Sequence, residues 1–581
     1  MNLTSRFHFL PQLAIAVVAV VCILLNTQFR KWEKEDAVIE HDVHIYYGYL
    51  PAYFIFDDIK VVKSDYQYAE NGHFFWTVET PDGKRVFKMT MGLAILYSPF
   101  FAVAHYYALH SDYPANGFSE PYKMMLLMAT VFYLVMGLWL VRMLLLRLGF
   151  SATTTAITLL LTGLGTNLLA YSTWMAPMPH AFNFFLFAAL AWLSLQWLNQ
   201  KTFLTYLGIG IVVGLITLVR PSNAVVLICC LVLWGRSVFE KKSILNFALI
   251  SLPTILLIWL PQLIYWKTVT GSYLCYSYAE EGFNFLDPQI ASGLFGFRKG
   301  WFIYTPLMLF AFVGMILMRN HLTRWRNAIL IFQLVNTYVI LSWWCWWYGG
   351  TIGHRAFIES YAWMVVPLAT FVQFVSDSKI KIRIPSIILA LFFIWLNIFQ
   401  IFQYDRKSLH FDSMSRTLYF KQFGKLEPIK DFNNHLQPAI YPVHKKSKIM
   451  KSKIFETITL QSGEGQFFTC LDIEPWLVTA TAAKEDSTTL LKLVTLDNGK
   501  IAIKSYQEKL FSAELDKGDF LTATRTSIGG WETFSMEILD SKTIAIKGSN
   551  GKYLSIDPAT GKIYANKESI TNNERFTITY K

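Results

Sequence analysis

Leu13-Ala-Ile-Ala-Val-Val-Ala-Val-Val-Cys-Ile-Leu-Leu25 is an unbroken apolar run near the start of the chain. It follows Arg6, as a signal peptide would, but no small-x-small cleavage site comes after it. We therefore interpret it as a retained first membrane helix. The composition agrees, because 54% of the 581 residues are hydrophobic and only 16% are charged, whereas soluble domains have about 45–50% apolar and about 25% charged residues.

Further apolar runs of membrane-spanning length follow this first one. They lie near 122–146, 155–170, 181–198, 203–219, 223–235, 244–265, 301–318, 327–345, 357–375 and 384–403, with a break at Arg220-Pro221. Lys and Arg gather in alternate loops, which is the positive-inside pattern, so the net charge of +12 is assigned to membrane flanks and no nucleic-acid partner is expected. We predict a polytopic α-helical membrane protein with about eleven transmembrane helices, its amino end cytoplasmic and its carboxyl end outside.

One apolar segment does not fit this alternation. Residues 91–109 are apolar enough to insert, but a span there would invert every later loop against its charge. We expect these residues to form a helix in the outer interface of the membrane. The outer loops are then 27–121, 171–180, 266–300 and 346–356.

The chain changes character after residue 405. Residues 406–454 are polar and basic, and are interpreted as an extracytoplasmic linker. From 455 to 581 the sequence repeats with a period of 43 residues, as in Ile458-Thr-Leu-Gln, Ile501-Ala-Ile-Lys and Ile544-Ala-Ile-Lys. Three repeats of short alternating strands predict a closed all-β domain. It resembles a β-trefoil of the fascin-like kind, and glycan binding and a purely structural or docking role stay equally open.

Charged and aromatic motifs far apart in the sequence share the outer face under this topology. Asp42 lies just beyond the first helix, whereas Lys88, Arg220 and Arg355 lie at the membrane rim of later segments. Cations at this level suit the phosphate of a lipid carrier, and a carboxylate suits the proton of an attacking hydroxyl. The aromatic rings suit a sugar face, although Trp343 and Trp344 are interpreted as interfacial anchors.

The order of these motifs resembles that of the GT-C glycosyltransferases, which include protein O-mannosyltransferases and the lipid A aminoarabinose transferase. The resemblance covers about residues 1–405 and lies in Asp42-x-x-x-Tyr46, in Arg298-Lys-Gly-Trp-Phe-Ile-Tyr-Thr-Pro306, in Trp346-Trp-Tyr-Gly-Gly350 and in Arg355-Ala-Phe-Ile-Glu359. It implies inverting transfer of a sugar from a polyprenyl phosphate to an extracytoplasmic glycan, lipid or protein, at the bacterial cytoplasmic membrane. Asp42 would be the catalytic base. The candidate substrate-binding residues are His44, Tyr46, Tyr47, Asp58, Lys88, His180, Arg220, Arg298, Lys299, Trp347, Tyr348, Arg355 and Glu359.

The sequence departs from the family pattern beside the proposed base. Val43 stands where a second acid often follows, so a divalent metal stays possible but no cofactor is assigned, and Asp57 or Asp58 would have to supply a second carboxylate. Glu35 and Asp36 are rival candidates for the base. Two other functions stay open, namely a transporter or flippase of lipid-linked glycans and an inactive scaffold that displays the β-domain. Six scattered cysteines predict neither a disulfide framework nor a zinc site.

Overall fold

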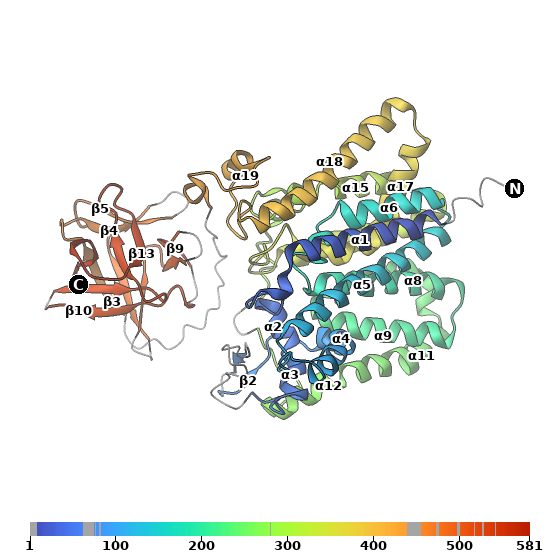
Figure 1. Cartoon of the computed structure of the whole chain (residues 1–581), viewed down its shortest axis with the longest axis horizontal. Coiled ribbons are helices and arrows are strands. Elements are labelled where there is room, and N and C mark those ends of the chain that lie inside the picture. The colour runs from blue at the N-terminus through green and yellow to red at the C-terminus, as the bar shows by residue number, and fades with distance from the viewer. Residues whose placement is uncertain are drawn as a thin grey trace. The chain divides into compact units, whose positions relative to one another are not determined.

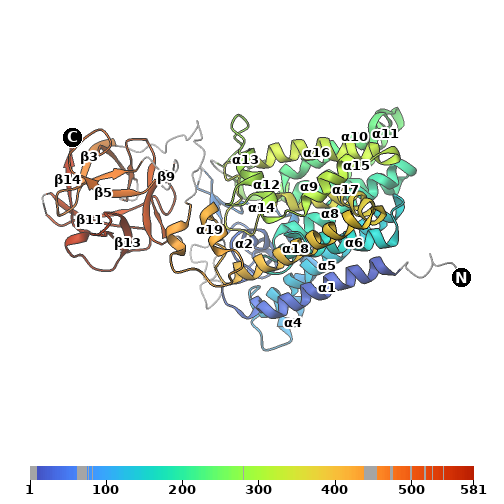
Figure 2. The same cartoon turned by 90° about the horizontal axis from the view of Figure 1, so that it is seen from above.

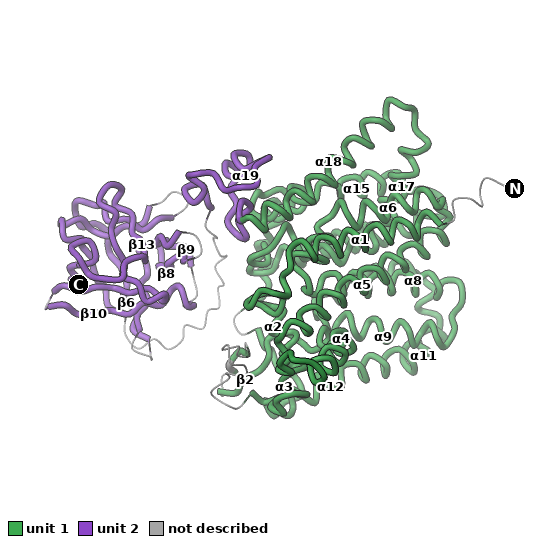
Figure 3. The backbone as a smooth tube through the Cα atoms, in the orientation of Figure 1, with its two compact units in different colours: residues 1–406 green, residues 407–581 purple. Residues whose placement is uncertain are grey.

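The chain divides into two compact units, residues 1–406 and 407–581 (Figure 3). The computed structural model describes residues 9–61, 75, 77–80, 83–278, 281–437, 455–471, 476–496, 500–515, 518–525, 528–540 and 542–581. Long apolar helices dominate the first unit, and strands dominate the second. The expected combination of a helical membrane part with an all-β domain is therefore confirmed.

The helical unit is built from α-helices, joined by short 3-10 segments and one π segment, η5, with a small two-stranded ribbon. In chain order the elements are α1 (Leu10–Phe29), η2 (Lys31–Glu33), α2 (His41–Tyr47), α3 (Tyr49–Phe54), β1 (Val78–Glu79), β2 (Arg85–Val86), α4 (Gly92–Leu109), α5 (Glu120–Arg147), α6 (Ala152–Leu164), α7 (Leu168–Tyr171), α8 (Pro179–Asn199), α9 (Phe203–Val219), η3 (Pro221–Val225), α10 (Val226–Trp234), η4 (Gly235–Phe239), α11 (Lys241–Asn246), η5 (Phe247–Ser251), α12 (Leu252–Thr270), α13 (Ile290–Phe295), α14 (Trp301–Tyr304), α15 (Met308–Leu317), η6 (Asn320–Leu322), α16 (Thr323–Leu341), η7 (Arg355–Ser360), α17 (Tyr361–Asp377) and α18 (Ile380–Asp405).

Every apolar run expected from the sequence coincides with one helix or with consecutive helical segments. In the part of the chain that the structure describes, 8 helical stretches have the length and hydropathy of a membrane span, and Ala152–Leu164, Phe203–Val219 and Met308–Leu317 are shorter apolar helices. The expected break is present, because α9 ends at Val219, Arg220 is extended, and η3 begins at Pro221. The total of about eleven spans stays a prediction.

The long helices lie side by side (Figures 1 and 2). Glycines allow close backbone contact between some of them. α15 packs on α17, and a Cβ added to Gly314 would meet the Pro367 carbonyl oxygen at 1.8 Å. α4 starts against the end of α9, where a Cβ added to Gly92 would lie 2.4 Å from the Val219 backbone nitrogen. Glycine permits such backbone contact between membrane helices. The second contact places the segment before α4 next to Arg220.

The segment that breaks the charge alternation forms α4. It packs antiparallel along the first half of α5, since the Tyr133 hydroxyl donates to the Leu96 carbonyl (3.2 Å) and His105 Nδ1 lies 2.5 Å from the Tyr122 hydroxyl. Tyr133 also meets Phe182, near the start of α8. α4 thus lies beside the part of α5 that extends beyond α8, at the same end of the unit as α2 and α3 (Figure 1). These contacts agree with a position of α4 in the membrane interface. Because α4 also has the length and hydropathy of a membrane span, the interfacial position stays a prediction.

The second unit begins within the predicted linker. Residues 407–437 contain α19 (Arg416–Gln422) and η8 (Phe432–His435), and bury Met414, Leu418 and Phe432. Residues 438–454, which include the basic end of the predicted linker, lie outside the described residues.

Each 43-residue repeat of the β-domain forms four strands. The strands are β3 (Phe455–Gln461), β4 (Phe467–Cys470), β5 (Val478–Ala482), β6 (Leu491–Thr495), β7 (Ile501–Lys504), β8 (Leu510–Glu514), β9 (Phe520–Arg525), β10 (Ser535–Ile538), β11 (Thr543–Lys547), β12 (Tyr553–Ile556), β13 (Ile563–Lys567) and β14 (Phe576–Tyr580), with η10 (Asn572–Glu574) before the last. The second and third strands of each repeat form a hairpin, and the register shifts after Phe467, Leu510 and Tyr553, which are 43 residues apart.

The remaining strands close on one another. β3 pairs with β6, β6 with β7, β10 with β11, β11 with β14, and β14 with β3. β7 and β10 meet through Ile501 and Phe534, whose backbones exchange two hydrogen bonds of 2.8 Å. Equivalent residues of the repeats fill the core, among them Ile458, Ile501 and Ile544, which are at most 4% exposed. Repetition in the sequence is therefore repetition in the packing.

Candidate active site

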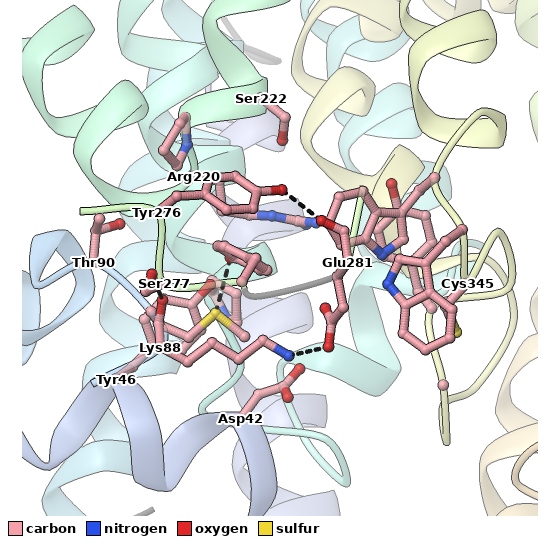
Figure 4. A pocket seen from close by; sticks show the side chains of 18 of the residues that line it. Asp42, Tyr46, Lys88, Thr90, Arg220, Ser222, Tyr276, Ser277, Glu281 and Cys345 are labelled. Atoms are coloured by element: carbon pink, nitrogen blue, oxygen red, sulfur yellow. Dashed lines mark hydrogen bonds and ion pairs between the residues drawn. The ribbon is translucent and has the colours of Figure 1, made fainter. Parts of the chain in front are cut away.

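A cavity of about 380 Å³ lies at one end of the helical unit, where loops from distant parts of the sequence meet. Figure 4 shows it from close by. Its walls carry charged and aromatic side chains together. They are formed by Asp42, Tyr46, Lys88, Met89, Thr90, Pro179, His180, Arg220, Pro221, Ser222, Trp266, Cys275, Tyr276, Ser277, Tyr278, Glu281, Phe283, Trp343, Trp344, Cys345, Tyr348, Gly349 and Arg355.

Asp42 lies in the first turn of α2, and its carboxylate reaches the cavity. An Arg355 Nη2 to Asp42 Oδ2 distance of 2.9 Å makes an ion pair, and the Asp42 side chain keeps 30% of its surface exposed. Burial raises the pKa of the Asp42 carboxyl, but the charges of Arg355, Lys88 and Arg220 outweigh that effect and hold the pKa below its usual range. The carboxylate is therefore ionised at neutral pH, and solvent or a ligand can reach it.

Lys88 is positioned by the segment between β2 and α4. The Phe87 amide donates to the Tyr265 hydroxyl (2.9 Å), and the Met91 amide donates to Gln262 Oε1 (2.8 Å). Helix α12 therefore binds this segment both before and after Lys88. The Lys88 ammonium contacts Glu281 Oε1 at 2.5 Å and lies 5.3 Å from the centre of the Tyr278 ring. Figure 4 shows the Lys88–Glu281 pair directly above the Asp42 carboxylate.

Arg220 is held by a buried carboxylate. Its Nη1 lies 3.2 Å from Glu359 Oε1, and His180 Nδ1 lies 3.0 Å from the same oxygen. Glu359 is 2% exposed and belongs to η7, whereas His180 belongs to the first turn of α8. A carboxylate buried this deeply requires such partners. The guanidinium of Arg220 also lies 5.6 Å from the centre of the Tyr348 ring.

Aromatic rings complete the walls. Trp343 contacts Tyr278 and Phe283, with ring centroids 5.8 and 4.8 Å apart. Trp343 and Trp344, which the sequence indicated as membrane anchors, line the cavity. The pKa of Tyr278 is raised to about 12, and burial of the hydroxyl is the largest cause. The hydroxyl is therefore neutral and can donate a hydrogen bond.

The structure brings about half of the sequence-predicted site residues to this cavity and places the others elsewhere. Those in the wall are Asp42, Tyr46, Lys88, His180, Arg220, Tyr348 and Arg355. Glu359 lies behind the wall as the partner of Arg220 and His180. Those that do not line it are His44, Tyr47, Asp58, Arg298, Lys299 and Trp347.

The residues outside the wall have structural surroundings. His44 is 5% exposed and packs edge-on against Phe118, and the Tyr47 hydroxyl donates to the Gly117 carbonyl (2.5 Å). Both point away from Asp42 because successive residues of a helix face different directions. The other four are buried in the protein. Lys299 donates to the Thr351 carbonyl, the Arg298 guanidinium lies 5.3 Å from the Trp347 ring centre, and Asp58 is 9% exposed.

Sequence reasoning missed Glu281, Tyr276, Tyr278 and Trp266. Glu281 belongs to the loop 266–300, which the sequence predicts to be outside, and Tyr276 and Tyr278 of the same loop are two residues apart. A carboxylate beside closely spaced tyrosines was the same signal that singled out Asp42 and Tyr46. Only the fold shows that Glu281 meets Lys88, which is 193 positions earlier in the chain.

The carboxylates of the cavity are paired with cations. Within the described ranges, no group of three or more His, Cys, Asp or Glu side chains lies close enough together to hold a metal ion. Asp42 pairs with Arg355, and Glu281 pairs with Lys88. A divalent cation needs oxygen ligands, and the carboxylate oxygens of this cavity are already paired with Lys and Arg. The side chains of the cavity therefore fit an anionic ligand better than a divalent cation.

Replacing Arg355 with Gln is expected to raise the pKa of the Asp42 carboxyl, because Arg355 is the largest charge that lowers it. In the wild type, the stabilising ionised form persists above the usual aspartate pKa of about 3.9 and is lost only as the pH falls through the lowered value. In R355Q this loss begins at a higher pH. Infrared difference spectroscopy during a pH titration, with D42N to assign the carboxyl band, measures the change. An unshifted titration would show that Arg355 does not control Asp42.

Fold and site together define a helical membrane protein with a charged, aromatic cavity and an appended all-β domain. A scan of protein-family models gives no match, and a search of curated proteins gives none.

Two solved structures are similar at low scores. The protein O-mannosyltransferase Pmt1-Pmt2 complex of S. cerevisiae bound to the sugar donor matches with 11% identity over 99% of this chain and 65% of that chain, at a TM-score of 0.23. The designed 3-fold symmetric protein ThreeFoil matches with 13% identity over 22% of this chain and 97% of that chain, at a TM-score of 0.20. Both TM-scores are below 0.5.

Proposed function

We propose that this chain is a membrane glycosyltransferase that moves a sugar from a polyprenyl phosphate to an extracytoplasmic hydroxyl acceptor. The observation that carries this proposal is the meeting of the Asp42 carboxylate with Lys88, Arg220 and Arg355 in one aromatic cavity. These four residues are spread over more than three hundred positions of the sequence. Such convergence is expected of a binding site and not of scattered surface charges.

The cations suit the phosphate of the donor. Lys88, Arg220 and Arg355 line the wall with two carboxylates, Asp42 and Glu281, and a third carboxylate, Glu359, holds Arg220 from behind the wall. The guanidinium groups can hold a phosphate through paired N–H groups, and their charge stabilises the phosphate as it leaves. The tyrosines and tryptophans of the wall offer flat faces against which a sugar ring can pack.

The polyprenyl chain has a path beside the cavity. Trp266 of α12 is buried in the wall, whereas Leu256, Leu257 and Ile264 of the same helix are among its exposed apolar side chains. An apolar outer face next to the phosphate site is the arrangement that a lipid-linked donor requires, with its head in the cavity and its tail in the bilayer.

Asp42 is the proposed base. As the acceptor oxygen bonds to the anomeric carbon, its proton passes to the Asp42 carboxylate. The bond between that carbon and the phosphate oxygen breaks, and its electron pair leaves with the polyprenyl phosphate. Attack from the side opposite the phosphate inverts the anomeric centre. Arg355 holds the carboxylate in place before the proton arrives.

The location follows from the charge of the loops. We place the protein in a bacterial cytoplasmic membrane, with the amino end in the cytoplasm and with the cavity and the β-domain outside. The closed ring of strands with one hairpin for each repeat supports a β-trefoil.

Deletion of the gene for this chain tests the proposed function. In cells of the source organism that lack this chain, one polyprenyl-phosphate sugar is expected to accumulate, because its transfer stops. Mass spectrometry of the extracted lipids measures the accumulation, and the wild-type gene should reverse it. Unchanged polyprenyl-phosphate sugars in the deleted strain would contradict a transferase function.

A further inference from the structure

A second cavity, of about 280 Å³, reaches Asp42 from another side. Asp42, Gly349 and Arg355 line both cavities. The other residues of this second cavity come from the segment after α1 and from two outer loops. They are Lys31, Val38, Glu40, His41, Val43, Met175, Ala176, Met178 and Gly350. The Asp42–Arg355 pair therefore stands between two separate spaces.

The walls of the second cavity are balanced in charge. Lys31 and Arg355 are matched by Glu40 and Asp42. The Lys31 ammonium is already committed, because it donates to Glu40 Oε1 (3.0 Å) and to the Trp174 carbonyl (3.1 Å) and lies 3.8 Å from the Trp174 ring centre. Arg355 is held by Asp42. Lys88 and Arg220 line the first cavity but not this one, so an anion entering it would meet the carboxylates of Glu40 and Asp42 and fewer cations.

Two residues of these walls have a strained backbone. Val38 has φ +73° and His41 has φ +49°. A positive φ is uncommon for residues other than glycine and is most unfavourable for β-branched ones. Such strain is of order 1–3 kcal/mol for each residue and is found mostly at functional sites. The two strained residues bracket Glu40, and His41 comes immediately before Asp42.

The geometry points to the second cavity as the acceptor site, and to an uncharged sugar as the acceptor. This inference rests on the proposed function, because it assigns the first cavity to the phosphate donor. Carboxylates accept hydrogen bonds from sugar hydroxyls, and Glu40 and Asp42 can both do so. A space slightly below the roughly 300–1,000 Å³ of drug-sized sites suits one sugar unit. An acceptor hydroxyl there can give its proton to Asp42 while it attacks a carbon held in the first cavity.

The test separates the two cavities with two variants of the full chain in lipid nanodiscs. Met175 is half-buried in the wall of the second cavity, so M175W fills that space without changing a charge. Lys88 belongs to the first cavity, so K88M removes a cation from the donor side. One probe is undecaprenyl phosphate, with binding followed by native mass spectrometry. The other is an array of neutral and phosphorylated oligosaccharides.

M175W is expected to reduce binding of neutral sugars at least tenfold and to keep undecaprenyl phosphate, which also shows that it is folded. K88M is expected to do the reverse. The acceptor assignment is overturned if the wild type binds no neutral sugar, if phosphorylated sugars bind better, or if M175W leaves sugar binding intact. That last result would place the sugar elsewhere, for instance on the β-domain. Failure of the wild type to bind undecaprenyl phosphate would instead contradict the proposed function.

Discussion

Asp42→Asn is expected to lower sugar transfer by about 10²–10⁴-fold, the range that a positioned general base contributes. The amide has the shape of the carboxylate but cannot accept the acceptor's proton at neutral pH. The measurement is the rate at which membranes that contain the variant consume the polyprenyl-phosphate sugar that accumulates in the deleted strain. Binding of the donor should persist, because Lys88 and Arg220 remain.

Asp36→Asn is the matched control. Asp36 was a rival candidate for the base, and in the structure it is exposed and lines neither cavity. Its replacement should leave transfer unchanged. If D42N transfers at nearly the wild-type rate, Asp42 is not the base, and if D36N is the inactive variant, the assignment of the two acids must be exchanged.

Glu359→Gln is expected to reduce the free energy of unfolding by about 3 kcal/mol, since removing one partner of a buried ion pair costs about 3–5 kcal/mol. The side chains of Glu359 and Arg220 are 3% and 18% exposed, and the partial exposure of Arg220 favours the lower end. Without the carboxylate, Arg220 loses its ionic partner, and His180 is left with the weaker, neutral amide oxygen as its acceptor. Unfolding of the purified chain in nanodiscs, followed by heat or denaturant, measures the loss.

The exposed pair between Arg30 and Glu33 supplies the comparison. Its side chains are 64% and 37% exposed, so Glu33→Gln should cost no more than about 1 kcal/mol. Equal stabilities of E359Q and E33Q would show that Glu359 does not hold Arg220 in the way the structure indicates.

The fold was largely predictable because its signals are local or periodic. Apolar runs of sufficient length predict the helices directly. A 43-residue repeat predicts equivalent strands even when the strands with which they pair are unknown. The break at Arg220-Pro221 was also predictable, since proline cannot continue the preceding helix's hydrogen bonding. By contrast, α2 is a single short helix, so spacing alone did not show that Tyr46 faces the cavity whereas His44 and Tyr47 face the packed interior.

The sequence by itself determined the membrane class, the positions of the helices, the repeated β-domain and the candidate acid Asp42. Only the tertiary structure decided that Glu281 pairs with Lys88, that Glu359 supports Arg220 from behind the wall, and that two cavities meet at Asp42. The physical reason is that hydropathy and repetition are properties of neighbouring residues. An ion pair or a cavity depends on how distant segments pack, which no single stretch of sequence contains.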